Sequence, residues 1–127
     1  TISVAGNMLA GPQVIEATAD AYEAGADLPL PERLIRAMQA GEAAGGDKRG
    51  RQSAALLVHD EEDSAMLDIR VDDHADPLAE LARLELVSRE RAIHARRFGP
   101  TRDNLTGIID RAELDAAIKR SIDEDYR

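Results

Sequence analysis

The spacing of apolar residues along the chain predicts four helices. Residues 12–25 and 31–44 each open at a proline, carry apolar side chains three or four positions apart, and run into glycine, which suits the left-handed end of a helix. Helical spacing returns from residue 77 to about 98 and from residue 110 to about 123. The side chains predicted to face the core on these last two helices are Leu78, Leu81, Ala82, Leu84, Val87, Ile109, Leu114, Ile118 and Ile122. Because the connector between the first two helices is short, we expect them to pack as an antiparallel pair.

Three segments have the pattern of β-strands. Residues 1–5 combine β-branched side chains with rough alternation, and Gly6-Asn7 then interrupts them. Residues 53–58 form an apolar run of strand length that could be buried on both faces, whereas residues 65–71 alternate between polar and apolar and predict a half-buried strand. The acidic turn at residues 60–63 joins these two into a hairpin.

The predicted order is a strand, two helices, a β-hairpin and two helices, which is an α/β (α+β) fold. Three strands are few for a free-standing sheet against four helices. We therefore expect further strands from a partner chain or from sequence beyond this one.

The composition excludes several classes of function. The chain has 16 basic and 25 acidic residues and a net charge of -9, which disfavours binding to nucleic acid and to anionic membrane surfaces. It has no cysteine, so disulfides and thiolate chemistry are absent. Only 2% of its residues are aromatic, which leaves little for stacking on bases or flavins, and we expect no cofactor. No signal peptide or membrane-spanning run is visible, and a cytoplasmic location is the expectation.

Three ordered blocks of sequence resemble a known family. Residues 4–11 (VAGNMLAG), 41–54 (GEAAGGDKRGRQSA) and 70–74 (RVDDH) are similar to the hallmark segments of the group catalogued as domain of unknown function 1028, which is assigned to the N-terminal-nucleophile hydrolase superfamily. The resemblance implies a four-layer αββα sandwich, of which residues 1–88 would be the carboxy-terminal portion. It also implies an amino-terminal chain of the same precursor as partner, and hence an oligomer. Residues 89–127 lie beyond the blocks and are predicted to be a charged helical extension.

The superfamily implies a role for Thr1. In such hydrolases an autoproteolytic cut exposes a threonine, serine or cysteine whose side chain attacks an amide while its own amino group acts as base. Thr1 opens a predicted strand, which matches that layout. The alternative is that residue 1 is only where a fragment or a proteolytic nick begins.

Five further residues are candidates for a site. Asn7 follows Gly6 at a strand end and could donate to a developing oxyanion, or it could be a turn residue in a left-handed conformation. In the glycine-containing loop at residues 45–53, Arg49 and Arg51 could hold a carboxylate in a fork-like geometry, and Gln52 and Ser53 complete the predicted substrate-binding residues. The alternative for this loop is a solvated connection.

Two acidic segments resemble metal sites without predicting one. Residues 72–76 place three aspartates beside His74, but such a run is more often a turn in which an aspartate caps the following helix. Residues 102–113 mimic a calcium-binding loop, yet Arg102 stands where calcium most needs a carboxylate. His59 and His94 lack metal-ligand spacing and are expected on the surface. No metal is predicted.

The sequence thus predicts an N-terminal-nucleophile amidohydrolase that cleaves an amide bond of a small, carboxylate-bearing substrate. Two alternatives stay open. In one, the chain is a non-catalytic part of a heteromer whose nucleophile lies on the amino-terminal portion. In the other, it is a protein-interaction module that docks a partner through its charged extension.

Overall fold

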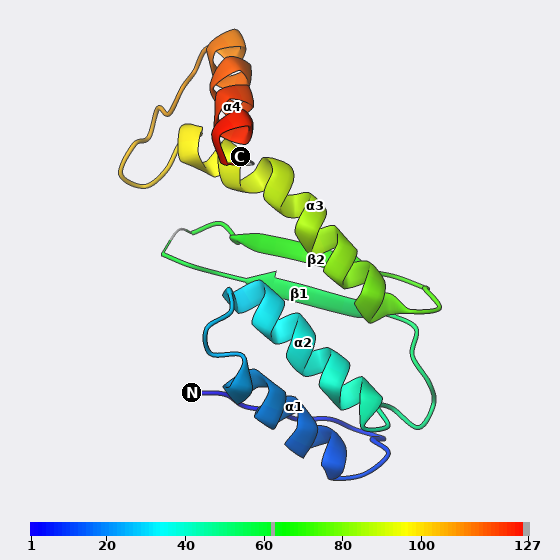
Figure 1. Ribbon diagram of the computed structural model, residues 1–127. Coiled ribbons are helices and arrows are strands. Elements are labelled where there is room, and N and C mark those ends of the chain that lie inside the picture. Colours follow the sequence, from blue (N-terminus) through cyan, green and yellow to red (C-terminus); the bar gives the residue numbers. More distant parts are fainter. Residues whose placement is uncertain (62, 126–127) are drawn as a thin grey trace.

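The computed structural model describes residues 1–61 and 63–125 (Figure 1). It contains four helices and one two-stranded sheet in the described residues. Their bounds are α1 Gln13–Ala24, α2 Leu30–Ala43, β1 Ala54–Val58, β2 Leu67–Val71, α3 Pro77–Phe98 and α4 Arg111–Asp125. The mixed α/β class, the four helices, the hairpin and their order confirm the prediction.

The core lies between one face of the hairpin and two helices. β1 and β2 pair antiparallel, so that Leu56 stands opposite Ile69 and Val58 opposite Leu67. Side chains alternate across a strand, and these four therefore share one face, on which α2 and α3 pack. The buried residues of this cluster are Ile35, Leu56, Val58, Leu67, Val71 and Leu81.

The helix α1 packs on α2 and lies on the far side of it from the sheet (Figure 1). The two helices approach closely at Gly41, where an added Cβ would meet the Thr18 hydroxyl and lie 3.4 Å from the backbone oxygen of Val14. The connector after α1 is short, and α2 begins with a proline in its first turn, where the missing backbone donor costs nothing. The predicted antiparallel helix pair is therefore present.

Two predictions about strands are wrong. Residues 1–5 form no strand, because β1 and β2 pair only with each other and the first segment runs along the helical side of the molecule instead (Figure 1). β1 is not buried on both faces either, since Leu57 and Ala55 are exposed on the face opposite the core. Within the described residues no layer covers that second face.

Two predicted core residues are also exposed. On α3 the buried stripe passes through Leu81 and Glu85, and this leaves Val87 on the solvent side. Ile109 precedes α4 by two residues, so helical spacing does not fix its direction, and it is exposed while Ala117 takes a buried place on the helix. The side chain of Ile122 lies outside the described residues.

α3 is the longest helix, with 22 residues, and it passes without a break through the predicted domain boundary at residue 88. α4 packs on it, and the connection between them closes where the Ile108 N–H donates to the Phe98 oxygen at 2.8 Å. Gly107 is needed in this connection, since its φ of 52° is left-handed and a Cβ would collide with the backbone of Gly99 and Pro100. Among the helices of the described residues, none is long and apolar enough to span a bilayer.

Candidate functional site

A glycine turn at the end of α2 begins the candidate site. Gly45 has a φ of 125° and Gly46 a φ of 49°, and both values strain residues that carry a Cβ. The two glycine N–H groups donate to the oxygens of Glu42 and Gly41, at 3.0 and 3.1 Å, which satisfies carbonyls at the helix end. The chain is thereby turned into the loop at residues 47–53, which leads to β1.

The segment before α1 lies against this loop. The Lys48 N–H donates to the Met8 oxygen at 2.9 Å, and the Ala10 N–H donates to the Gly46 oxygen at 2.9 Å. Leu9 and Asp47 form a β-bridge between these two bonds. Asn7 directly precedes this pairing, so the structure brings it beside the loop, where it is exposed.

Two non-glycine residues in the described part have a positive φ, Met8 at 59° and Asp73 at 55°. Such a backbone costs on the order of 1–2 kcal/mol for an L-residue, with aspartate among the more tolerant, and strained residues cluster at functional sites. Met8 contacts the loop through its backbone, and Asp73 accepts a hydrogen bond from the Gln52 amide at 3.3 Å. Both strained positions therefore adjoin the same loop.

The loop surrounds a polar hollow of about 680 Å³. Its walls come from the end of α2, from the loop, and from the turn between β2 and α3. The lining residues are Glu42, Asp47, Arg49, Gly50, Arg51, Gln52, Ser53 and Asp73. The four residues predicted to bind substrate thus line one hollow. The Gln52 backbone oxygen also accepts from the His74 N–H at 2.9 Å, which holds the loop against the turn.

The two arginines of the hollow differ in how tightly a carboxylate pairs with them. Arg49 donates from Nε and Nη2 to the two carboxylate oxygens of Asp47, at 2.9 and 2.6 Å, and its backbone N–H donates to the same carboxylate at 2.8 Å. These bonds lower the pKa of Asp47 to about 2 and raise that of Arg49. Arg49 is therefore already occupied by a bidentate partner.

Arg51 is held loosely. Its Nη1 lies 3.4 Å from the Asp76 carboxylate and 3.8 Å from the Glu42 carboxylate, and its side chain makes no hydrogen bond within the described residues. Asp76 is at the same time the cap of α3, accepting from the Ala79 N–H at 3.1 Å. Arg51 is exposed, so its guanidinium is available to a ligand in the hollow.

Thr1 is not brought to this hollow. It is exposed and precedes Met8 by seven residues that form no helix or strand, and Figure 1 draws the amino terminus at the other end of α1 from the loop after α2. An extended chain covers about 3.3 Å per residue, so seven residues can separate Thr1 from Met8 by up to about 20 Å. Thr1 and Arg51 therefore do not share a site in this arrangement.

The segments that resemble metal sites use their side chains otherwise. Asp72 binds the Arg70 guanidinium at 2.9 and 3.1 Å, Asp73 binds Gln52, and Asp76 caps α3. This confirms the interpretation of residues 72–76 as a capped turn. No group of three histidine or acidic side chains among the described residues is placed to hold a metal ion.

The connection before α4 also uses its side chains for structural contacts, and its Arg102 donates to Asp63 in the hairpin turn at 2.7 Å. Asn104 accepts from the Thr106 hydroxyl and the Gly107 N–H, both at 3.1 Å. Asp110 caps α4 by accepting from the Glu113 N–H at 2.8 Å. The side chain of His94 lies outside the described residues, and His59 is exposed as predicted.

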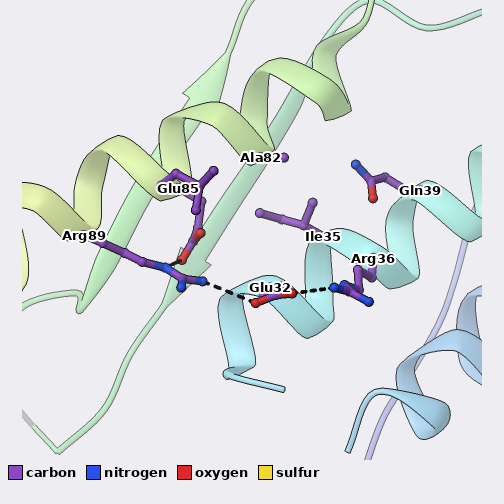
Figure 2. Close-up of a pocket in the computed structure, with 8 residues that line it drawn as sticks. Glu32, Ile35, Arg36, Gln39, Ala82, Glu85 and Arg89 are labelled. Atoms are coloured by element: carbon purple, nitrogen blue, oxygen red, sulfur yellow. Dashed lines mark hydrogen bonds and ion pairs between the residues drawn. The ribbon is translucent and has the colours of Figure 1, made fainter. Parts of the chain in front are cut away.

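A second cleft was not predicted from the sequence. It lies between α2 and α3 and is lined by ion pairs among Glu32, Arg36, Glu85 and Arg89, of which the pair of Arg89 with Glu32 crosses from one helix to the other (Figure 2). Glu85 is only 5% exposed, although it is charged. The sequence signal that could have revealed this cleft is the residue spacing. Glu85 follows Leu81 by four residues on the buried stripe, and Arg89 follows Glu85 by four more.

The chain is similar to a known protein family and to a solved structure. Residues 1–81 match the model of a family described as "Family of unknown function (DUF1028)". The crystal structure of protein SPO2555 from Silicibacter pomeroyi, described with the same family model, is similar with a TM-score of 0.68 and 31% sequence identity. The similarity covers 83% of this chain and 45% of that one, so this chain spans less than half the length of the solved protein. No curated protein matches the sequence.

Proposed function

The chain belongs to the DUF1028 family, and from that premise we propose that it is the substrate-binding part of an amidohydrolase of the N-terminal-nucleophile type. The substrate is a small amide that carries a carboxylate and binds in the polar hollow. The observation that carries this proposal is Arg51, an exposed and loosely paired guanidinium at a hollow whose other walls are polar. The resemblance to the superfamily supports the amide-bond chemistry.

Arg51 is the residue that binds the substrate carboxylate. Its contacts of 3.4 and 3.8 Å are longer than a hydrogen bond between ionised groups. A substrate carboxylate that binds Arg51 at about 2.8 Å therefore makes a stronger contact than the two it replaces. Arg49 does not share this role, because its guanidinium would have to break two short hydrogen bonds to Asp47. The Arg49–Asp47 pair instead fixes the shape of the loop.

The remaining charges of the hollow favour a substrate that also carries an amino group. Once Arg49 and Asp47 neutralise each other, the charged residues left in the lining of the hollow are Arg51 and the carboxylates of Glu42 and Asp73. A ligand with only a negative charge is repelled by both, whereas an ammonium group placed beside them is attracted. A short peptide-like zwitterion therefore fits the hollow better than a simple acid.

The nucleophile for such a substrate comes from outside this hollow, because Thr1 is not among its lining residues and the amino terminus lies at the opposite end of α1 from the loop (Figure 1). We assign it to another chain or segment that completes the αββα sandwich. Both strands of the hairpin support this, since within the described residues each pairs on one side only and offers its other edge to a further strand. The exposed second face of β1, with Leu57, is the surface on which a second sheet would pack.

The test is calorimetric titration of the full chain with four probes. These are glycylglycine, which has both charges and an amide, N-acetylglycine, glycinamide and acetamide. We expect glycylglycine to bind best and Arg51→Met to weaken it about tenfold or more, as loss of a hydrogen bond between charged groups does. Arg111→Met, on α4, is the control, since it removes an exposed arginine that pairs with Asp115 and does not line the hollow. Equal affinity of wild type and Arg51→Met would refute the proposal.

A second measurement concerns Thr1. In the assembled enzyme, Thr1→Ala should leave both glycylglycine binding and hydrolysis unchanged. Loss of hydrolysis with unchanged binding would make Thr1 the nucleophile and contradict the assignment above, while the binding role of Arg51 would stand on its own titration.

A further inference from the structure

The carboxylate of Asp73 differs from the other acidic groups around the polar hollow, because within the described residues no basic side chain pairs with it. By contrast, the Asp47 carboxylate is paired with the Arg49 guanidinium at 2.6 Å, and the Asp76 carboxylate lies 3.4 Å from the Arg51 guanidinium. Asp73 therefore contributes a negative charge to the wall of the hollow that no neighbouring cation balances.

The turn after β2 fixes the direction of this carboxylate. Asp73 has a left-handed backbone with a φ of 55°, and its Oδ1 accepts from the side-chain amide of Gln52 at 3.3 Å. The N–H of His74, one residue later, donates to the Gln52 backbone oxygen at 2.9 Å. Because the Gln52 side chain is neutral, it orients the carboxylate without cancelling its charge. Asp73 is exposed, so a ligand in the hollow reaches it directly.

Glu42, which also lines the hollow, is less available to a cation. Its Oε1 lies 3.8 Å from the Arg51 guanidinium. Its Oε2 lies against the glycine turn, where a Cβ added at Gly46 would collide with it. A cation at Glu42 competes with Arg51 for the same carboxylate, whereas a cation at Asp73 displaces no ion pair. Asp73 is therefore the better place in the hollow for a positive charge.

We propose that Asp73 binds the ammonium group of a substrate whose carboxylate binds Arg51, so that the hollow selects short peptides with a free amino terminus. This inference rests on the proposed function, and it adds the residue that distinguishes a free amino terminus from a blocked one. The volume of about 680 Å³ lies within the range of about 300–1,000 Å³ that holds drug-sized ligands, so the hollow admits a dipeptide. An N-acylated amino acid brings the same carboxylate but no cation for Asp73.

Two ligands of equal size isolate the ammonium group. Glycylglycine and N-propionylglycine share the amide and the carboxylate, and a methyl group of the second takes the place of the ammonium of the first. Both are titrated into the full chain, and binding is followed by backbone amide shifts in nitrogen-15 NMR. We expect glycylglycine to bind about fivefold more tightly, the factor that corresponds to the stronger ion pairs at exposed sites.

Asp73→Asn tests the residue. Asparagine tolerates a left-handed backbone and keeps an oxygen that accepts from Gln52, so the variant removes the charge and retains the turn. We expect its affinity for glycylglycine to fall to that for N-propionylglycine, whose own affinity does not decrease. Asp72→Asn is the matched control, since it removes the same charge from the adjacent residue, which pairs with Arg70 and does not line the hollow. The control should keep the preference of about fivefold.

Equal affinities of the two ligands in the wild type would overturn the inference. So would an undiminished preference for glycylglycine in Asp73→Asn, or an equal loss of that preference in Asp72→Asn. Loss of the preference in Glu42→Gln together with its retention in Asp73→Asn would place the ammonium at Glu42 and overturn the inference as well.

Arg51→Met separates this inference from the function on which it rests. Both ligands carry the carboxylate, so this variant should weaken both by the same factor. If it does so while Asp73→Asn leaves the preference unchanged, the carboxylate site stands and the role of Asp73 is wrong. If Arg51→Met weakens neither ligand, both proposals fail.

Discussion

Replacing Leu81 by alanine should remove a large part of the folding free energy of this protein. Leu81 is fully buried at the centre of the cluster that joins α3 to the hairpin and to α2. The substitution deletes three carbon atoms, whose transfer from water is worth about 2.4 kcal/mol at about 0.8 kcal/mol each. A cavity is left as well, because strands on one side and a helix on the other limit collapse, and the total expected loss is about 4 kcal/mol.

This loss is large compared with the whole stability. A chain of 127 residues is expected to have a free energy of unfolding of about 6 to 19 kcal/mol, at about 0.05–0.15 kcal/mol per residue. The assay is urea unfolding followed by circular dichroism, with the free energy and the denaturant slope fitted for each variant. Leu86→Ala is the matched control on the same helix, and since Leu86 is largely exposed it should change stability by less than about 0.5 kcal/mol. A loss below about 1 kcal/mol for Leu81→Ala at an unchanged slope, or an equal loss for Leu86→Ala, would refute this account of the core.

Two further predictions concern the loop. The Arg49 side chain and backbone N–H hold the pKa of Asp47 at about 2 instead of 3.8, so a carbon-13 NMR titration should give a midpoint near 2 in the wild type and a higher midpoint in Arg49→Met, where only the backbone bond is left. Because the folded pKa is lowered, the stabilisation from this pair is fully present above pH 3.8 and is lost as the pH falls through about 2, and a midpoint that does not move in the variant would contradict the pairing. Gly45→Ala should destabilise the chain by about 1–3 kcal/mol more than Gly50→Ala in urea unfolding. Both glycines have a positive φ, but only at Gly45 would the new Cβ collide, 2.7 Å from the Cβ of Ala10, and equal losses would show that this contact does not matter.

The helices were predictable because local signals agree with one another along the chain. Prolines at residues 12, 31 and 77 lie at or next to helix starts, and glycines at 25, 45 and 99 follow helix ends. The absence of a strand at residues 1–5 was not predictable in the same way, since β-branched residues become a strand only where a neighbouring strand offers hydrogen bonds. An apolar run such as residues 54–58 likewise does not reveal whether a layer covers its second face.

The residues of the candidate site were predictable from the sequence, but the contacts that each of them makes were not. The three blocks of sequence that resemble the family do meet at the loop, since residues 8–10 and residues 73–74 each contact residues 46–53. What sequence could not show is that Asp47 engages Arg49 and leaves Arg51 loosely paired, because two residues of separation allow either arrangement. The distance of Thr1 from the loop depends on the path of the first segment, which no local pattern determines.

The position of α4 has a consequence for cooperativity. Within the described residues its principal contact is with α3, and Figure 1 shows it standing beside the later part of that helix, away from the sheet. Release of α4 therefore exposes little of the cluster around Leu81, so it is a sub-global opening that requires less free energy than complete unfolding. Backbone amides of α4 should consequently exchange with deuterium faster than those of β1, β2 and the first turns of α3. The chain is built as two folding units that share one helix, and the loop around Arg51 belongs to the slower-exchanging unit.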